Sequence, residues 1–210
     1  MISLSTRMLL AIMLFSGISV SGYADEQGIK RPYSINLTFG RPEVAISSEN
    51  TAPDFDLSRN SQINLGYDFN PWWGIETGIS IVADNESEIA HDLAGSYQTT
   101  LSSKSALLGA HGYYPIADKF RGYLRLGGLA YKASLDLEET FDDVKEAGKD
   151  SATDNGFGYY YSLGFDWQPT KVTVVRIEYQ RQELLDVFSD SIRSFDITYS
   201  GLALGIGIYF

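Results

Sequence analysis

Apolar and polar residues alternate along most of this 210-residue chain, and a repeat of two residues is the period of a β-strand with two different faces. In the first such run, Tyr33–Gly40, aromatic and aliphatic residues occupy the odd positions and small polar residues mostly the even ones. The last run ends at Phe210 and sets large apolar residues against Gly and Ala. The pattern therefore restricts the chain to paired strands whose sheet has one apolar face.

Eight runs follow this rule. The predicted strands cover residues 33–40, 63–70, 73–81, 101–114, 120–137, 157–167, 171–182 and 195–210. The links after the second, fourth and sixth strands are tight turns, each with a proline that cannot donate to a strand ladder: Pro71, Pro115 and Pro169. The other links are long, polar and acidic.

Short turns on one side, long loops on the other and an even number of strands are typical of outer-membrane proteins. In lipid every backbone polar group needs a partner within the protein, so only a closed sheet is stable there. The predicted fold class is therefore all-β: an eight-stranded antiparallel transmembrane up-and-down β-barrel with short periplasmic turns and long external loops. The alternative is a soluble β-sandwich, because its edge strand would alternate likewise.

The two ends of the chain carry transport signals. A charged start, an apolar run from Met8 to Ser16 and small residues up to Ala24 predict a signal peptide over residues 1–24, with the barrel domain over 25–210. A membrane-anchoring helix would need a longer apolar run, of about 20 residues. At the other end, Ile206, Ile208 and Phe210 resemble the signal that the outer-membrane assembly machinery recognises. The protein is therefore expected in the outer membrane.

Composition excludes several classes of function. The net charge of −11, from 16 basic and 27 acidic residues, gives no basic surface for nucleic acid. The absence of cysteine removes disulfides, thiol nucleophiles and Cys-ligated zinc. The acidic loops contain no Asp-x-Asp-x-Asp-Gly calcium motif, so neither a metal nor another cofactor is expected.

Four segments resemble the eight-stranded transmembrane domain of the outer membrane protein A family. They are Asn70–Gly78, Tyr113–Ile116, Leu124–Leu129 and Arg176–Gln180, and the resemblance covers about residues 65–182. It implies an outer-membrane protein with a structural role. We expect no peptidoglycan-binding domain after the eighth strand, and therefore no wall-anchoring role.

The resemblance also implies a cluster of charges inside the barrel. In that family, charged lumen residues form a salt-bridge gate, and the matching positions here are Glu76, His111, Asp166 and Arg176. The expected pairs are Glu76 with Arg176 and His111 with Asp166, although His111 replaces a lysine and Asp166 a glutamate. Because the charge of an imidazole changes between about pH 5 and 8, a histidine in this cluster predicts pH-dependent lumen behaviour.

Arg125 matches a further inward arginine of the family. An inward Arg125 sends Tyr123, Leu129 and Tyr131 inward as well, so we expect a bulge near Gly127-Gly128 that switches the two faces. The predicted inner face is otherwise Gly, Ser, Asn and Tyr, which indicates a hydrated, plugged interior too narrow for a wide pore. The charges then either form a narrow gated ion path or only fill and rigidify the lumen.

The partners expected are outer-membrane lipids, lipopolysaccharide and the assembly machinery, and the protein is expected to be a monomer. The acidic loops, such as the segment from Asp136 to Asp154, leave open an adhesin or receptor function. A lipid A-modifying enzyme is a weaker alternative, because His91 and His111 are the two histidines and no His-x-Ser arrangement occurs near the C-terminus. No catalytic residue is predicted.

Overall fold

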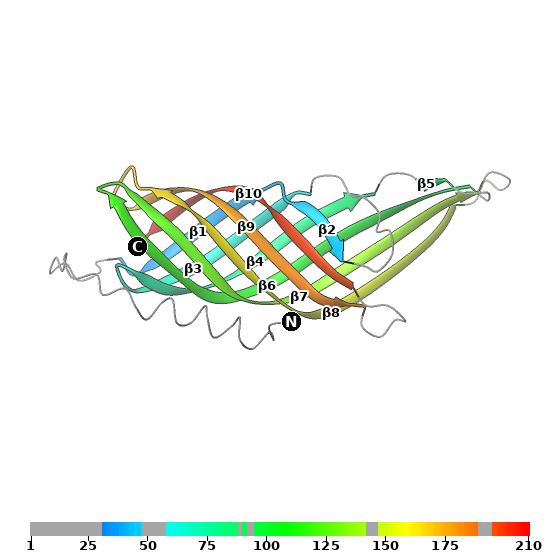
Figure 1. The fold of residues 1–210 in the computed structure, drawn as a ribbon, viewed down its shortest axis with the longest axis horizontal. Helices are drawn as coiled ribbons and strands as arrows, with labels where there is room; N and C mark the ends of the chain where they lie inside the picture. Colours follow the sequence, from blue (N-terminus) through cyan, green and yellow to red (C-terminus); the bar gives the residue numbers. More distant parts are fainter. Residues whose placement is uncertain (1–30, 48–57, 88–89, 92–94, 142–146, 189–194) are drawn as a thin grey trace, which may run out of the picture.

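The computed structural model describes residues 31–47, 58–87, 90–91, 95–141, 147–188 and 195–210 (Figure 1). The elements in this part of the chain are all strands, and no helix there is long and apolar enough to span a membrane. Their bounds are β1 Tyr33–Gly40, β2 Glu43–Ser47, β3 Asn60–Asn70, β4 Trp73–Glu86, β5 Ala90–His91, β6 Gly95–Ala117, β7 Phe120–Phe141, β8 Ala147–Trp167, β9 Thr173–Val187 and β10 Phe195–Tyr209. The predicted signal peptide lies outside the described residues.

The strands form one closed antiparallel sheet. Neighbours pair in the order β1-β3-β4-β6-β7-β8-β9-β10, and β10 pairs back onto β1 to close the ring. The last residue takes part in the closure, since the amide of Phe210 donates to the carbonyl of Tyr33 at 2.9 Å. The predicted eight-stranded antiparallel barrel is therefore confirmed.

β2 is the continuation of β1 rather than a ninth wall strand. Both pair with β10 in one unbroken register, with Gly40 opposite Ala203 and Glu43 opposite Ser200. The interruption falls at Arg41-Pro42, where proline has no amide hydrogen to donate to a ladder. The short β5 pairs only with β6 and adds a small flap at the loop end of the barrel.

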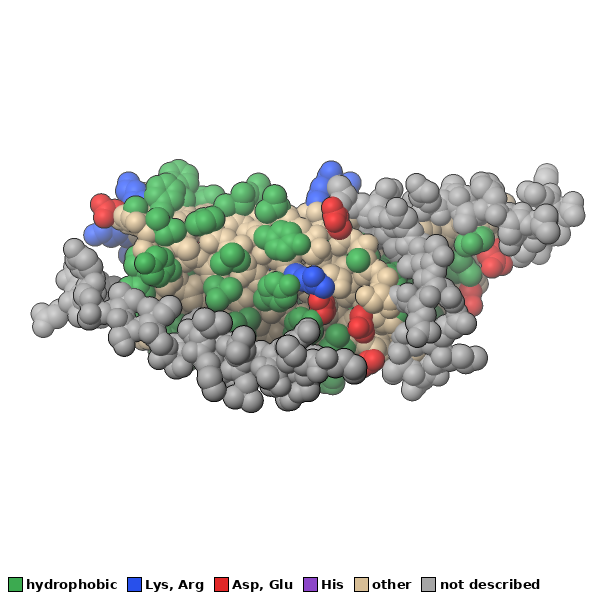
Figure 2. Space-filling model, in the orientation of Figure 1, with side chains coloured by type: hydrophobic (Ala, Val, Ile, Leu, Met, Phe, Trp, Pro, Cys, Tyr) green, Lys and Arg blue, Asp and Glu red, His purple; other side chains and the backbone are tan. Residues whose placement is uncertain are grey.

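The two faces of the wall are inverted relative to a water-soluble protein. Apolar residues point outward and are exposed, whereas the alternate polar residues are buried in the lumen. On β1, for example, Phe39 is 57 % exposed and its neighbour Thr38 only 2 %. Figure 2 shows hydrophobic side chains spread over the outer wall. This arrangement suits a sheet surrounded by lipid, because lipid-facing and lumen-facing residues alternate along each strand.

An aromatic belt surrounds part of the barrel near the short turns. The ring centroids of Phe69 and Trp73 lie 4.7 Å apart, those of Tyr33 and Tyr67 5.2 Å, and Tyr33 stacks on Phe210 at 5.9 Å. Aromatic girdles of this kind mark the membrane–water interface of outer-membrane barrels.

Six strands are longer than the sequence predicted, and β6, β7 and β8 reach furthest on the side of the loops. The expected strands 101–114, 120–137 and 157–167 extend to 95–117, 120–141 and 147–167, and β7 pairs with β8 up to Thr140 opposite Ala147. Figure 1 shows β6, β7 and β8 continuing beyond the other strands. Much of the acidic segment 136–154 is therefore strand, not loop, because cross-strand pairing satisfies its backbone despite its charge. The side chain of His91 lies outside the described residues.

The interior has two layers, of which the sequence predicted one. On the side of the loops, inward-facing apolar residues pack together as a buried cluster. We call this the apolar layer: Val82, Leu101, Leu107, Leu129, Tyr131, Ala133, Tyr160, Leu184, Val187, Ile197 and Tyr199. The predicted hydrated interior of Gly, Ser, Asn, Tyr and a few charges did not include this cluster, in which aliphatic residues pack with three tyrosines.

Candidate functional site: the charged lumen

The five charged residues expected in the lumen come from five different strands. Glu76 lies on β4, His111 on β6, Arg125 on β7, Asp166 on β8 and Arg176 on β9. Each side chain points inward, and each residue is at most 4 % exposed. On every one of these strands, the charge lies closer to the short turns than the members of the apolar layer do.

The expected pairings within this cluster are wrong. Arg176, expected to pair with Glu76, instead binds Asp166, with Nε to Oδ1 at 2.6 Å and Nη2 to Oδ2 at 3.0 Å. These two residues lie directly opposite each other on β8 and β9. His111, expected to pair with Asp166, has Nε2 at 2.6 Å from Oδ1 of Asp68. The register of the strands therefore places Arg176 and His111 beside partners that are one or two strands away on the wall, and not beside the expected partners across the lumen.

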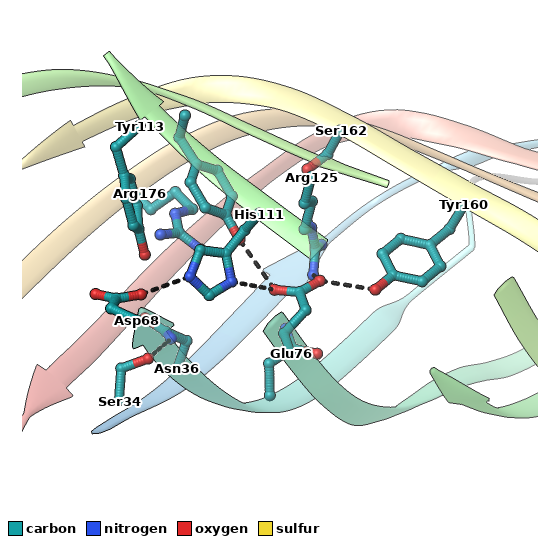
Figure 3. A network of polar contacts seen from close by, with 12 residues as sticks. Ser34, Asn36, Asp68, Glu76, His111, Tyr113, Arg125, Tyr160, Ser162 and Arg176 are labelled. Atoms are coloured by element: carbon teal, nitrogen blue, oxygen red, sulfur yellow. Dashed lines mark hydrogen bonds and ion pairs between the residues drawn. The ribbon is translucent and has the colours of Figure 1, made fainter. Parts of the chain in front are cut away.

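Glu76 is the centre of a polar network that connects four strands (Figure 3). Its Oε1 accepts a hydrogen bond from the hydroxyl of Tyr160 at 2.8 Å and lies 3.5 Å from Nη1 of Arg125. Its Oε2 lies 3.2 Å from the hydroxyl of Tyr123 and 3.8 Å from Nδ1 of His111. Figure 3 shows His111 between Asp68 and Glu76, so one imidazole faces two carboxylates.

Arg125 extends this network to the opposite wall. Its Nη2 donates to Oε1 of Glu178 on β9 at 2.8 Å, and its Nε donates to Oγ of Ser162 at 2.8 Å. Pairing between β6 and β7 continues without a register shift through Gly127 and Gly128, so the expected bulge is absent there. Tyr123 points inward like Arg125, because residues two apart on a strand lie on the same face.

Glycines make the cross-wall contacts possible. Glu76, Gly109, Gly127 and Tyr160 follow one another across β4, β6, β7 and β8 in a single row. A Cβ on Gly127 would lie 2.7 Å from Cε1 of Tyr160, and one on Gly109 would also collide with the tyrosine hydroxyl. The absence of these side chains lets the Tyr160 ring lie across two strands and reach Glu76.

Gly74 has the same role between Asp68 and His111, and it provides a test. A Cβ at this position would lie 2.6 Å from Nε2 of His111 and 2.9 Å from Cα of Asp68. We expect Gly74→Ala to lower the free energy of unfolding by about 1–3 kcal/mol, measured by urea titration of the barrel in lipid vesicles. Gly112→Ala is the matched control, because its nearest neighbour would be the carbonyl of Trp72 at 3.6 Å. Equal stability of the two variants would contradict this role.

A second cluster surrounds Asp166, nearer the short turns. Arg121 on β7 donates to Oδ2 of Asp166 at 2.9 Å, so that this carboxylate, which is 0 % exposed, is held by two arginines. Each guanidinium also lies over an aromatic ring, Arg121 at 3.5 Å from the centroid of Tyr113 and Arg176 at 3.2 Å from that of Tyr123. Cation–π contacts of this kind stabilise a buried cation.

Sequence reasoning missed three members of the lumen network: Asp68, Arg121 and Glu178. The signal was available for Asp68 and Glu178, since both fall on the inward positions of predicted strands. With them the network formed by the described residues has four carboxylates and three guanidiniums, so a positive charge on His111 would make it neutral. Within the described residues no group of three or more potential ligands is arranged to hold a metal ion.

Comparisons with known proteins agree with this architecture. Outer membrane protein A of Klebsiella pneumoniae is 28 % identical over 127 residues, and that of Shigella dysenteriae is 26 % identical over 132 residues. These matches cover 59 % and 63 % of this chain but only 34 % and 35 % of the relatives, so the chain spans about a third of their length.

Among solved structures, the outer membrane protein OprG of Pseudomonas aeruginosa has the same fold, with a TM-score of 0.53 and 14 % identity over 87 % of this chain and 98 % of that one. The family model of the outer membrane protein β-barrel domain matches residues 10–210. The chain therefore belongs to the outer membrane protein β-barrel family and is a protein of the Gram-negative outer membrane.

Proposed function

We propose that this protein is a structural component of the outer membrane whose lumen is closed to ions. The observation that carries the proposal is the stacking of the apolar layer on the paired charge network inside one narrow barrel. A barrel of about eight strands is filled by its own side chains. An ion entering the lumen would therefore meet an apolar barrier on one side and occupied charge partners on the other.

The apolar layer is the stronger of the two barriers. Leu101, Leu184 and Ile197 come from three strands and are all 0 % exposed. An ion inside such a layer would lose much of its hydration shell, and the hydroxyl groups of Ser103 and Ser105, which lie between Leu101 and Leu107, replace only part of it, so entry costs several kcal/mol. Hydrophobic constrictions close channels for this reason.

The charge network supports closure through its pairing. Arg125 and Arg176 are each held by a carboxylate within 2.8 Å and are at most 3 % exposed. Releasing either partner to let an ion pass would leave a buried charge without compensation. The network therefore rigidifies the part of the lumen near the short turns and contributes to envelope integrity, and it does not form a path for ions. No catalytic step is assigned to it.

Planar-bilayer recordings test the proposal through a pair of leucines. Leu107 and Leu129 lie opposite each other on β6 and β7, both inside the apolar layer. We expect the wild type to show no discrete conductance and the double variant Leu107→Ser/Leu129→Ser to conduct, because shorter polar side chains admit water. The control Leu108→Ser/Leu126→Ser changes outward leucines on the same strands and should stay silent. A conducting control or a silent lumen variant would contradict the proposal.

A further inference from the structure

The outer wall of the barrel carries a groove where β1, β3 and β10 meet near the loops. It has a volume of about 590 Å³. Its lining includes four outward apolar residues and two arginines: Phe39, Ile177, Leu202, Leu204, Arg41 and Arg59. The apolar members face the surroundings of the barrel, since Leu202 and Leu204 are 65 % and 63 % exposed. The groove therefore opens toward the membrane, away from the charged lumen.

Pro42 weakens the wall at this point. The ladder between β1 and β3 ends with Gly40 opposite Asn60, and the amide of Ser58 donates to the carbonyl of Pro42 at 3.0 Å. Facing residues of such a pair normally exchange two hydrogen bonds, but proline has no amide hydrogen for the second one. One bond of the ladder is therefore missing beside the groove.

This register sets two like charges against each other. Arg41 and Arg59 lie opposite one another in the non-hydrogen-bonded position, where side chains of an antiparallel pair come closest. Like charges directly opposite each other are destabilising. Neither arginine forms an ion pair with any residue in the part of the chain that the structure describes. A bound anion would remove the repulsion, and two guanidiniums suit a phosphate best because each can bind it bidentately.

The position of the pair indicates which phosphate it meets. Arg41 comes directly after the end of β1, on the same outward side as Phe39. Arg59 comes directly before the start of β3, on the same outward side as Ser61 and Ile63. Both arginines therefore mark the loop-side border of the apolar band. Headgroup phosphates lie at this depth, and acyl chains lie beside the apolar residues below. We propose that the groove binds a phosphorylated lipid of the external leaflet, of the lipid A type, with a phosphate between Arg41 and Arg59 and an acyl chain along Phe39 and Leu204. The site is independent of the closed lumen.

Native mass spectrometry of the protein from phosphatidylcholine nanodiscs containing diphosphorylated lipid A tests this site. We expect Arg41→Gln/Arg59→Gln to weaken lipid A binding about ten-fold, because two charge-assisted contacts are lost. The control Lys104→Gln/Lys132→Gln removes an equal charge from a directly opposed pair on the outer face of β6 and β7, outside the groove. It should change binding less than about two-fold.

A third variant separates folding from recognition. Arg41→Lys/Arg59→Lys keeps both charges but loses bidentate geometry, so it should bind more weakly than the wild type and more tightly than the glutamine variant. Heat-modifiable migration on gels verifies that each variant is folded. If Arg41→Gln/Arg59→Gln and Lys104→Gln/Lys132→Gln weakened lipid A binding equally, the loss would reflect the total charge of the protein and not this groove. That result would overturn the proposal. An unchanged affinity of the arginine variants, or displacement of lipid A by millimolar inorganic phosphate, would overturn it too.

Discussion

Replacement of Arg125 by methionine is expected to lower the free energy of unfolding by about 3–5 kcal/mol, the usual cost of removing one partner from a buried ion pair. Arg125 is 1 % exposed and joins Glu178 to Glu76, so its loss leaves two carboxylates without their cation. Methionine keeps much of the volume of the side chain, which limits the contribution from an empty cavity. Urea unfolding of the barrel in lipid vesicles, followed by tryptophan fluorescence, measures the change.

A double-mutant cycle separates this charge effect from packing. Glu178→Gln in the Arg125→Met background removes one of the stranded charges and should recover part of the lost stability, whereas Glu178→Gln alone should destabilise the wild type. If the two changes were simply additive, the ion pair between Arg125 and Glu178 would not be the source of the loss.

Asp166→Asn should also lower the free energy of unfolding by about 3–5 kcal/mol, because it removes the anion, and not the cation, of a buried cluster. The carboxylate of Asp166 accepts hydrogen bonds from both Arg121 and Arg176. Asparagine preserves shape and part of the hydrogen bonding but leaves two neighbouring guanidiniums without a counter-charge. Urea unfolding under the same conditions as above measures the loss.

A surface pair provides the matched control for Asp166. Glu138 and Lys149 form an ion pair on the long β7–β8 hairpin, with side chains 56 % and 69 % exposed. Glu138→Gln neutralises a carboxylate just as Asp166→Asn does, yet water screens it, so the expected change is below about 1 kcal/mol. Comparable losses in the two variants would mean that burial does not set the strength of the lumen pairs.

The alternation of residues predicted the barrel and its inner face because a slip of one residue would move every polar side chain into lipid. Glu76 and Arg176 were placed in the lumen on that basis, together with the family resemblance. Their partners could not be predicted, because partner choice depends on how far each strand is staggered against its neighbour. Asp166 pairs with Arg176 since the register sets them side by side, a relation between strands that period alone does not contain.

The apolar layer was missed for a related reason. Inward residues such as Leu107 and Leu129 interrupt an otherwise small or polar inner face on each strand separately. Only the closed ring brings them to one level, where they pack with Ile197 from a strand far along the sequence. Similarly, the sequence does not distinguish Gly109 and Gly127 from other strand glycines, because their role depends on the Tyr160 ring that lies across them from a neighbouring strand.

Single-channel recording of the refolded wild-type protein tests the closed lumen most directly. Recordings at acidic and at neutral pH also test the sequence prediction that the lumen responds to pH through His111, which faces Asp68, Glu76 and the rings of Tyr113 and Tyr123. A pH-dependent lumen stays a prediction from the sequence, whereas the apolar layer predicts the same silent baseline at both pH values. Discrete, reproducible openings of the wild type at either pH would contradict a closed barrel.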